Sequence, residues 1–490
     1  MTIFRITVCA LALVWSTLSA TAQSMKVNAG GITYVHSSAN TGDMTFSGGT
    51  QLTIEGKTYN VSDITSMEVT SESVADNTVS VVYQGSSATV TIAGNVARYM
   101  TATVNGAKVS ISQSEDLQQE VTYTLSGSST GGSFYMDGDY KANFVLNNLT
   151  LTNANGAAID IEDGKAISVS LVGANSLSDI SGGSHNACFY IDGHPTFSGT
   201  GSLTIAGNTK HALSVDEHMV ISSGTITVTK AVSDGFHLSE YLRMDGGTVN
   251  ITATGDGIDM GFKGVSKGTK DDYENNGFVF LNGGTLTIST SGNAAKGLKA
   301  DSTVIVAGAT VSVTVSGAAY YDTDESDIAS SSALKTDGAF TLSSGTVSLL
   351  SNGVGGKGLN VTGNISVTGG RMTVVTLGDR YKYNSNLDSK PQGIKTDGNI
   401  SITGGEVYSA VYDSKATTFK TDNSFVVKGG TIMGIGGKAI ALTSGSQTYQ
   451  TYTDQTVTGG TAYTQNGVSF TTPADYYNSK AFVIVSSPSM

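Results

Sequence analysis

The feature of this 490-residue chain that most constrains its fold is a short phrase that recurs eleven times over residues 157–443. Each copy holds one apolar residue among small ones, followed by polar and often acidic residues, as in Gly393-Ile-Lys-Thr-Asp-Gly398. A second phrase, Gly-Gly-Thr followed by alternating apolar residues, recurs between the copies, for example at residues 246–251. The central apolar residues of the first phrase are Ile159, Phe189, Leu213, Phe236, Ile258, Leu298, Leu334, Leu359, Ile394, Phe419 and Ile440. Repetition at a short period indicates a stacked, solenoid architecture.

The repeat unit is about 22 residues long, and some copies carry additions. Apolar residues alternate within it at a period of two, as in residues 224–229, and glycine pairs separate the runs. This is the pattern of short strands joined at tight corners. A unit of this size cannot bury its own apolar face, but stacked copies share one continuous core. The sequence therefore predicts an all-β protein with the fold of a right-handed parallel β-helix. Propellers need blades of about 40 residues, and leucine-rich repeats need a consensus that this chain lacks.

The chain divides into four regions. Residues 1–22 are typical of a secretory signal peptide, because Arg5 precedes a short apolar run and Ala20-Thr-Ala22 offers a cleavage site. We expect a small N-terminal β region over residues 23–75, the β-helix over 76–445 and a C-terminal β cap over 446–490. The protein is thus predicted to be exported, to the periplasm, the cell surface or the exterior. No later apolar run is long enough for a transmembrane segment.

Acidic residues outnumber basic ones, 40 against 27, which gives a formal net charge of −13. This charge disfavours nucleic acid as a partner and suits calcium, which binds carboxylate oxygens. Keeping a long exposed surface soluble is the simpler explanation. Cys188 is the only cysteine beyond the signal, which excludes an internal disulfide framework. The histidines show no spacing typical of a metal site or a catalytic triad; they are His36, His185, His194, His211, His218 and His237.

Three long spacings between copies of the phrase locate insertions, at about residues 262–276, 318–332 and 378–391. The second and third insertions each end immediately before an apolar residue of the phrase. They are therefore predicted to leave the same corner of the solenoid, two coils apart. Solenoids gather insertions on one face, and that face is often the binding face.

Alternation also predicts which side chains point outward. The residue after each apolar position and the residue two further on should both face solvent, and adjacent coils lie about 4.8 Å apart. In the C-terminal half these positions form a lysine ladder beside an aspartate ladder, as in Lys335 with Asp337. Two interpretations stay open. The charges neutralise one another, at about 0.2–1 kcal/mol a pair, or the lysines bind the carboxylates of an acidic polysaccharide while the aspartates hold calcium.

Several segments resemble one known family. They are Thr122-Tyr-Thr-Leu-Ser-Gly127, Val145-Leu-Asn-Asn-Leu-Thr-Leu151, Gly156-Ala-Ala-Ile159 and the repeated units themselves. Over residues 77–441 the chain resembles the secreted bacterial carbohydrate-binding β-helix family, whose characterised members bind pectic polysaccharide and calcium. The resemblance implies a right-handed β-helix with a pectate-lyase-like topology. It also implies a binding module rather than an enzyme.

The insertions carry the candidate binding residues. Tyrosines stack on sugar rings, and arginine and lysine pair with carboxylates; the expected ligand-binding residues are Tyr320, Tyr321, Arg380, Tyr381, Lys382 and Tyr383, with Lys299, Lys335 and Lys395 of the ladder. Carboxylates close together in sequence are candidate calcium ligands, and these are Asp322, Asp324, Asp327, Asp271, Asp272 and Glu274. The glycine that shapes an EF-hand loop is missing. The plain alternative is a set of solvated loops.

The predicted function is that of an exported carbohydrate-binding protein that recognises an acidic, pectin-like polysaccharide with the help of calcium. No catalytic residue is assigned. A calcium-dependent polysaccharide lyase is an alternative, with Lys299 or Lys335 as the base, although equivalent lysines in a ladder are more typical of a surface. Residues 336–338 and 396–398 match only part of the polygalacturonase Asn-Thr-Asp signature. A structural surface protein or adhesin is the third possibility.

Overall fold

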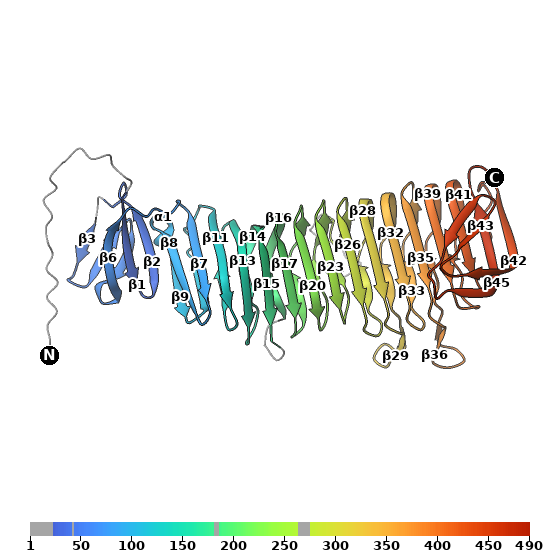
Figure 1. The fold of residues 1–490 in the computed structure, drawn as a ribbon, viewed down its shortest axis with the longest axis horizontal. Coiled ribbons are helices and arrows are strands. Elements are labelled where there is room, and N and C mark those ends of the chain that lie inside the picture. The colour runs from blue at the N-terminus through green and yellow to red at the C-terminus, as the bar shows by residue number, and fades with distance from the viewer. Residues whose placement is uncertain (1–22, 42–43, 181–185, 263–274) are drawn as a thin grey trace.

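The computed structural model describes residues 23–41, 44–180, 186–262 and 275–490. The predicted signal peptide therefore lies outside the described residues. The chain forms one long rod (Figure 1), and the parallel pairings between coils place the strands of each coil on three faces. This arrangement confirms the predicted parallel β-helix.

The first sheet carries the repeated phrase, and we call it the anchor face. Its strands are β10 (Lys108–Gln113), β12 (Ser133–Asp137), the first part of β14 (Ile159–Val172), the first part of β16 (Ala187–Gly199), β18 (His211–Val215), β21 (Phe236–Ser239), β24 (Ile258–Gly261), β27 (Lys296–Ala300), β31 (Ser332–Thr336), β33 (Lys357–Val361), β38 (Ile394–Thr396) and β40 (Phe419–Lys420).

The chain then turns onto the second face. Its strands are the first part of β13 (Ala142–Asn153), the second parts of β14 and β16, β19 (Met219–Ile221), β22 (Tyr241–Met244), β25 (Phe278–Leu281), the first parts of β28 (Val304–Val315) and β32 (Phe340–Ser351), β34 (Ile365–Val367), and the first parts of β39 (Ile400–Val411) and β41 (Phe425–Gly436).

The third face closes each coil. It consists of the second part of β13, β15 (Ala174–Asp179), β17 (Ser202–Gly207), β20 (Thr225–Ala231), β23 (Thr248–Ala253), β26 (Thr285–Thr290), β35 (Arg371–Thr376) and the second parts of β28, β32, β39 and β41.

The apolar residues of the phrase stack as predicted. Ile159 pairs with Phe189, and the same register continues coil by coil to Phe419. The side chains of this column are almost completely buried, with Leu334 at 0% and Phe419 at 3% exposure. Ile440 departs from the prediction, because it lies outside the strands and only packs part-buried against the core.

The Gly-Gly-Thr phrase marks the corner between the second and third faces. Gly430 has a φ of +76°, a left-handed conformation that non-glycine residues rarely adopt. A Cβ atom there would lie 2.6 Å from the carbonyl oxygen of Gly405 in the preceding coil. The phrase recurs because the backbone of each coil turns sharply at this corner and passes close to the backbone of the preceding coil. Only glycine fits there.

Both ends of the rod are covered. At the N-terminus, β1 (Ser24–Ala29), β2 (Ile32–Ser37) and β6 (Ile64–Thr70) form an antiparallel unit beside the short sheet of β3 (Thr45–Ser47), β4 (Gln51–Ile54) and β5 (Lys57–Asn60). β2 pairs with β8 (Ser87–Ala93), and apolar residues of this region belong to the same buried cluster as the solenoid core. Three strands and one short helix lead into the first coils. They are β7 (Thr78–Gln84), α1 (Gly94–Ala97), β9 (Met100–Asn105) and β11 (Val121–Ser129).

At the other end, β45 (Tyr477–Ser486) runs antiparallel to β41 and to β42 (Tyr449–Thr458). The hairpin of β43 (Ala462–Gln465) and β44 (Val468–Thr471) completes this region. It encloses a second apolar cluster that includes Tyr408, Met433 and Phe470. The C-terminal region thus covers the outer side of the last coils of the third face.

The stacked core predicts the effect of Leu334→Asp. An unpaired carboxylate in the column should cost several kcal/mol, because no partner in the apolar interior replaces its hydration. We expect loss of the cooperative thermal unfolding transition monitored by circular dichroism. Ser348→Asp, on the exposed side of β32, should unfold as the wild type does. A normal transition for Leu334→Asp would contradict the register.

Candidate functional site

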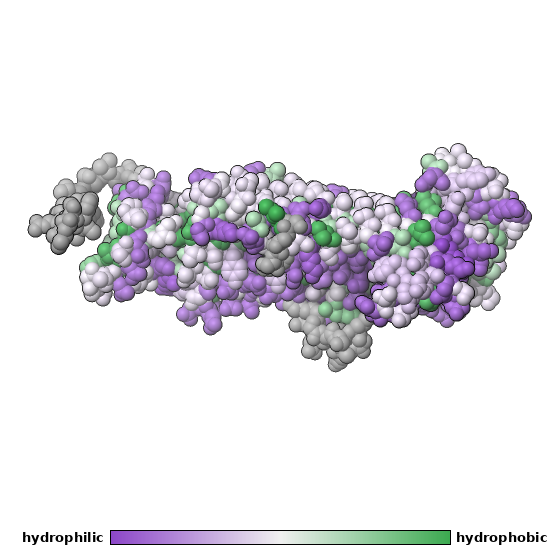
Figure 2. All heavy atoms as spheres, turned by 90° about the horizontal axis from the view of Figure 1, so that it is seen from below, coloured by the Kyte–Doolittle hydropathy of each residue, from purple (hydrophilic) through white to green (hydrophobic). Residues whose placement is uncertain are grey.

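Two hairpins project from the same edge of the rod, as the insertions predicted (Figure 1). One consists of β29 (Tyr320–Asp322) and β30 (Asp327–Ala329), and the other of β36 (Tyr381–Lys382) and β37 (Asp388–Ser389). They touch at their aromatic side chains, because the rings of Tyr321 and Tyr383 stack with centroids 3.9 Å apart and planes 3° from parallel. Figure 2 views the rod from this side, where the surface is mostly hydrophilic.

Lys357 connects the bases of the two hairpins. Its Nζ donates a hydrogen bond of 2.5 Å to the Ser330 hydroxyl, just after β30, and one of 3.1 Å to the Ser389 hydroxyl, in β37. Within the described part of the chain, no carboxylate lies at ion-pair distance from this amine. Burial, and then the positive charges of Lys395 and Lys296, lower the pKa of Lys357 from its ordinary value of 10.5 to about 8.

Beside Lys357 lies a shallow pocket between the second hairpin and the anchor face. We call it the basic pocket; its lining residues are Lys357, Asp388, Ser389, Lys390, Gln392, Lys395 and Lys420. Four of these seven side chains are lysines, so the pocket is suited to an anion. Sequence reasoning missed Lys357 and Lys390. Lys357 occurs in a copy of the phrase that has asparagine in place of the ladder lysine, and Lys390 reaches the pocket only through the fold of the hairpin.

The lysine ladder forms in the predicted register, but its charges are paired. Lys335 Nζ lies 3.1 Å from Asp337, and Lys395 Nζ lies 2.8 Å from Asp397. Lys299 contacts Asp259 of the preceding coil at 2.7 Å and Asp301 at 3.8 Å. Lys420 pairs with Asp422 in the same way. These contacts favour mutual neutralisation for most of the ladder.

The threonines of the Lys-Thr-Asp phrase serve the backbone. The hydroxyl of buried Thr336 donates to the carbonyl of Ser302, and that of Thr396 donates to the carbonyl of Gly363. Each hydroxyl links a coil to the one before it. The partial likeness to the polygalacturonase signature therefore has a structural cause.

The remaining predicted ligand-binding residues lie on the hairpins. Tyr320 and Tyr383 are 40% and 50% exposed, and Lys382 is also exposed. Arg380 forms an ion pair with Asp388. The Cβ atom of Tyr381 lies against Gly355. The structure thus gathers these side chains with Lys395 and leaves Lys299 three coils away.

The predicted calcium ligands divide into two groups. Asp271, Asp272 and Glu274 lie outside the described residues. Asp322 and Asp327 face each other across the β29–β30 pair, and Asp324 lies in the exposed turn between them. The Oδ1 atom of Asp322 accepts the backbone N–H of Asp324 at 3.0 Å. These carboxylates share one hairpin, but the described residues gather three potential metal ligands elsewhere.

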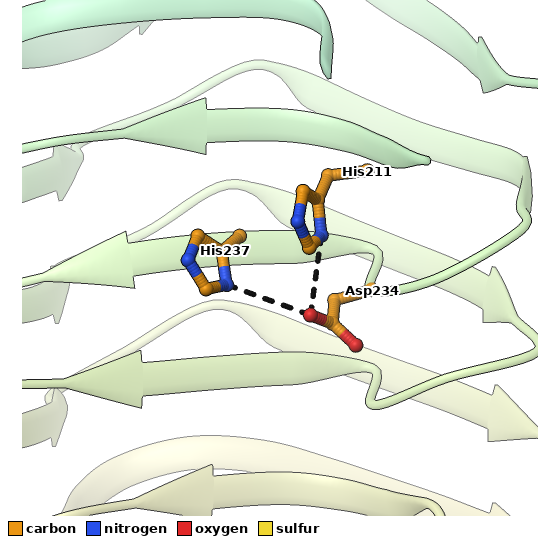
Figure 3. A group of neighbouring side chains, drawn as sticks. All are labelled: His211, Asp234 and His237. Atoms are coloured by element: carbon orange, nitrogen blue, oxygen red, sulfur yellow. Dashed lines mark ion pairs between the residues drawn. The ribbon is translucent and has the colours of Figure 1, made fainter. Parts of the chain in front are cut away.

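That other group is His211, Asp234 and His237 on the anchor face (Figure 3). Nδ1 of His211 lies 3.1 Å from Oδ2 of Asp234, and Nδ1 of His237 lies 3.5 Å from the same oxygen. Asp234 and Asp259 raise the pKa of His237 to about 9, although burial opposes this. Burial would raise the pKa of Asp234, but the two imidazoles hold it well below its usual range. The sequence spacing of the histidines does not reveal this group, because stacking joins residues of different coils.

A second stack lies on the second face. The rings of His194 and His218 are 4.7 Å apart, and that of Tyr241 lies 4.5 Å beyond His218. Glu217 pairs with His194 at 2.7 Å and Glu240 pairs with His218 at 3.2 Å. An alignment of the repeat units in the sequence could have found this stack. His194, His218 and Tyr241 hold equivalent positions, at or just before the start of a strand on the second face.

Together these features define a β-helix whose exposed anchor face and hairpins combine aromatic, cationic and acidic side chains. A family model described as a carbohydrate-binding domain-containing protein matches residues 105–380, more than half of the chain. The protein therefore belongs to this carbohydrate-binding family, and carbohydrate is its class of ligand.

A solved structure, the polysaccharide lyase-like protein from C. thermocellum in a gadolinium derivative, is similar at 23% sequence identity with a TM-score of 0.42. The similarity covers 54% of this chain and 96% of that one. No curated protein matches the sequence. No helix among the described residues is long and apolar enough to cross a membrane.

The lowered pKa of Lys357 predicts a pH-dependent stability. Between pH about 8 and 10.5 the folded protein binds fewer protons at this amine than the unfolded chain, so this contribution to stability should rise with pH across that window. Lys357→Met should remove the rise and should be more stable relative to the wild type at pH 7.5 than at pH 10.5. Urea unfolding at both pH values measures the difference. Lys428→Met, on the exposed side of β41, is the control; an equal response of both variants would refute the assignment.

Proposed function

We propose that the protein binds an acidic, pectin-like polysaccharide at the hairpin end of the anchor face, with one uronate carboxylate in the basic pocket. The single observation that carries the proposal is Lys357, whose amine meets two serine hydroxyls at the bottom of a site built around lysines. A partly buried ammonium group without a counter-ion is unfavourable. A carboxylate from the ligand supplies that counter-ion, which favours an acidic sugar over a neutral one.

The surroundings of the pocket suit a linear polymer. Lys395 and Lys420 stand in successive coils of the anchor face, and Lys335 continues the ladder on the far side of the Asn360 coil. Charges that repeat along the rod match charges that repeat along a polyuronide chain. Asp397 and Asp422, which pair with Lys395 and Lys420, are exposed to solvent. They therefore remain accessible to a cation that binds together with the polysaccharide.

The stacked Tyr321 and Tyr383 place an aromatic pair on the two hairpins, outside the lining of the basic pocket. Rings of this kind pack against the apolar face of a sugar, and their hydroxyls bond to its oxygens. The only tryptophan of the chain, Trp15, lies in the predicted signal peptide. The mature protein thus offers small aromatic contacts suited to a single chain rather than a broad flat platform for a crystalline polymer. Export past the inner membrane, as the signal predicts, would place it where such polymers occur.

Calcium is the proposed helper ion. The half-buried Asp322 and the exposed Asp324 and Asp327 stand on the hairpin whose Tyr321 contacts the second hairpin. Calcium takes six to eight oxygen ligands, and uronate oxygens complete such a shell where the protein supplies only part of it. The ion then bridges the acidic hairpin and the acidic ligand.

A lyase is the second candidate, and Lys357 is the observation that favours it. A pKa of about 8 suits a general base. Lys299 is a less suitable base, because burial lowers its pKa but the pairing with Asp259 outweighs burial and raises that pKa above its ordinary value. In this reaction neutral Lys357 would take the proton beside the uronate carboxylate. The C–O bond to the leaving sugar would break as a C=C bond forms, and the leaving oxygen would take a proton from solvent water.

Binding to polygalacturonate tests the proposal. Lys357→Met should weaken binding by at least about thirtyfold, since the loss of one partner of a buried charge pair costs about 2 kcal/mol or more. Wild-type affinity should fall from pH 7 to pH 9 as Lys357 loses its proton, and the variant should not show this fall. Tyr321→Ala with Tyr383→Ala should also weaken binding. Isothermal titration calorimetry gives the constants.

The controls for this experiment are Lys428→Met and a neutral galactan, which should bind at most weakly to every variant. Equal affinity of wild type and Lys357→Met for polygalacturonate would reject the basic pocket as the site. Growth of absorbance from an unsaturated uronate product, absent in Lys357→Met, would assign the lyase instead of the binding module.

Calcium should raise the melting temperature in the presence of polygalacturonate, by an amount that grows with calcium concentration. Asp322→Asn with Asp324→Asn should reduce this shift, because two oxygen ligands lose their charge. Asp116→Asn, exposed near the opposite end of the rod, should leave it unchanged. Differential scanning calorimetry with and without a chelator measures the effect, and an identical shift in the double variant would remove this hairpin from the calcium proposal.

A further inference from the structure

We propose that His211, Asp234 and His237 form a binding site for a divalent transition-metal ion of the zinc type. The three side chains come from two successive coils of the anchor face, with His211 in β18, His237 in β21 and Asp234 in the bend before β21. Figure 3 shows both imidazole rings directed at the Asp234 carboxylate. One ligand atom from each residue lies within 4.8 Å of the other two.

The distances fit a metal centre. Zinc bonds to nitrogen and oxygen are about 2.0–2.2 Å long, so neighbouring ligands on a tetrahedron lie about 3.3–3.6 Å apart. The separations from Oδ2 of Asp234 to Nδ1 of His211 and of His237 are 3.1 and 3.5 Å. Small side-chain rotations would make both equal to the tetrahedral edge. The two nitrogen atoms and the oxygen thus lie within 4.8 Å of one another, and rotation of the stacked imidazole rings would bring all three onto one ion.

The other histidine stack shows that ring stacking alone does not produce this convergence. His194 and His218 stack at 4.7 Å and 23°, much as His211 and His237 do at 4.3 Å and 20°. Each of the former histidines, however, has its own glutamate: Glu217 for His194 and Glu240 for His218. Among the described residues, only the pair on the anchor face shares a single carboxylate oxygen, and only His211, Asp234 and His237 bring three potential ligand atoms within 4.8 Å of one another.

Neighbouring groups hold the carboxylates in place. Oδ1 of Asp234 accepts the backbone N–H of Asp256 at 2.9 Å, which leaves Oδ2 for the two histidines. Asp259 binds Lys299 through Oδ1 at 2.7 Å and presents Oδ2 at 3.5 Å from Nδ1 of His237. Hydrogen bonds of this kind orient the ligands of metal sites and raise their affinity. Oδ2 of Asp259 or a water molecule would occupy the fourth position.

The site is both anchored and accessible. The His211 side chain is 4% exposed and that of Asp234 is 14% exposed, whereas His237 is 44% exposed. An ion can therefore enter from solvent beside His237 and bind between ligands that packing holds in place. Imidazole nitrogens suit zinc, cobalt, nickel and copper, whereas calcium takes oxygen ligands only. A bound ion would tie one coil to the next, and so would stabilise the middle of the rod.

Titration of the tag-free mature protein with Zn²⁺ at pH 7.5 tests the site. We expect one high-affinity ion per chain by calorimetry, a higher melting temperature, and, with Co²⁺ as a probe, visible absorption typical of tetrahedral nitrogen and oxygen ligation. His237→Gln and the near-isosteric Asp234→Asn should each lower zinc affinity at least about 100-fold, the upper end of what loss of a supporting group costs. Millimolar Ca²⁺ should not displace the ion.

The matched control is His194→Gln with His218→Gln, which removes the other stacked pair and should leave zinc affinity and the cobalt spectrum unchanged. His237 is partly exposed, so its variant should fold, and far-ultraviolet circular dichroism verifies this. Failure of the wild type to bind zinc would overturn the proposal. So would equal affinity in His237→Gln, loss of binding in the control variant, or ready displacement by calcium.

Discussion

The inward column of apolar side chains is the constraint on which the rest of this structure depends. Each coil places one such residue directly on the residue below it, from Ile159 to Phe419. Side chains in a strand alternate between two faces, so a slip of one residue would expose the whole column and bury its charged neighbours. The same register that closes the core therefore decides which lysines and aspartates stand side by side on the anchor face.

The inserted segments project from the corners of the coils. They therefore do not change the register of the strands. The two hairpins that start beyond the third face differ in sequence, yet they return the chain to the same position on the anchor face. Their common corner brings Tyr321 onto Tyr383 and puts a serine from each hairpin on Lys357. Function in this region thus belongs to loops that a rigid scaffold positions.

Most charges on the anchor face are satisfied by a neighbour, which is why the exceptions are informative. Lys335 and Lys395 each form an ion pair with the aspartate two residues further along the chain. Lys357 has hydroxyl partners instead of a carboxylate, and Asp234 serves two imidazoles with one oxygen. These two departures carry the proposals for an acidic glycan and for a metal ion.

The sequence by itself determined the fold, the register and the common corner of the two hairpins, because all three follow from the spacing of apolar and glycine residues. It also identified the lysine and aspartate ladders, of which Lys335 and Asp337 are members. It did not decide which of these lysines pair with aspartates and which bind a ligand. Only the tertiary structure decided three contacts. His211 and His237 both lie against Asp234, and the amine of Lys357 binds at the bases of both hairpins. Arg380 forms an ion pair with Asp388. The physical reason is that periodicity fixes where each backbone position lies. The contacts of a side chain depend on the residues that neighbouring coils and folded hairpins bring to it from far along the chain.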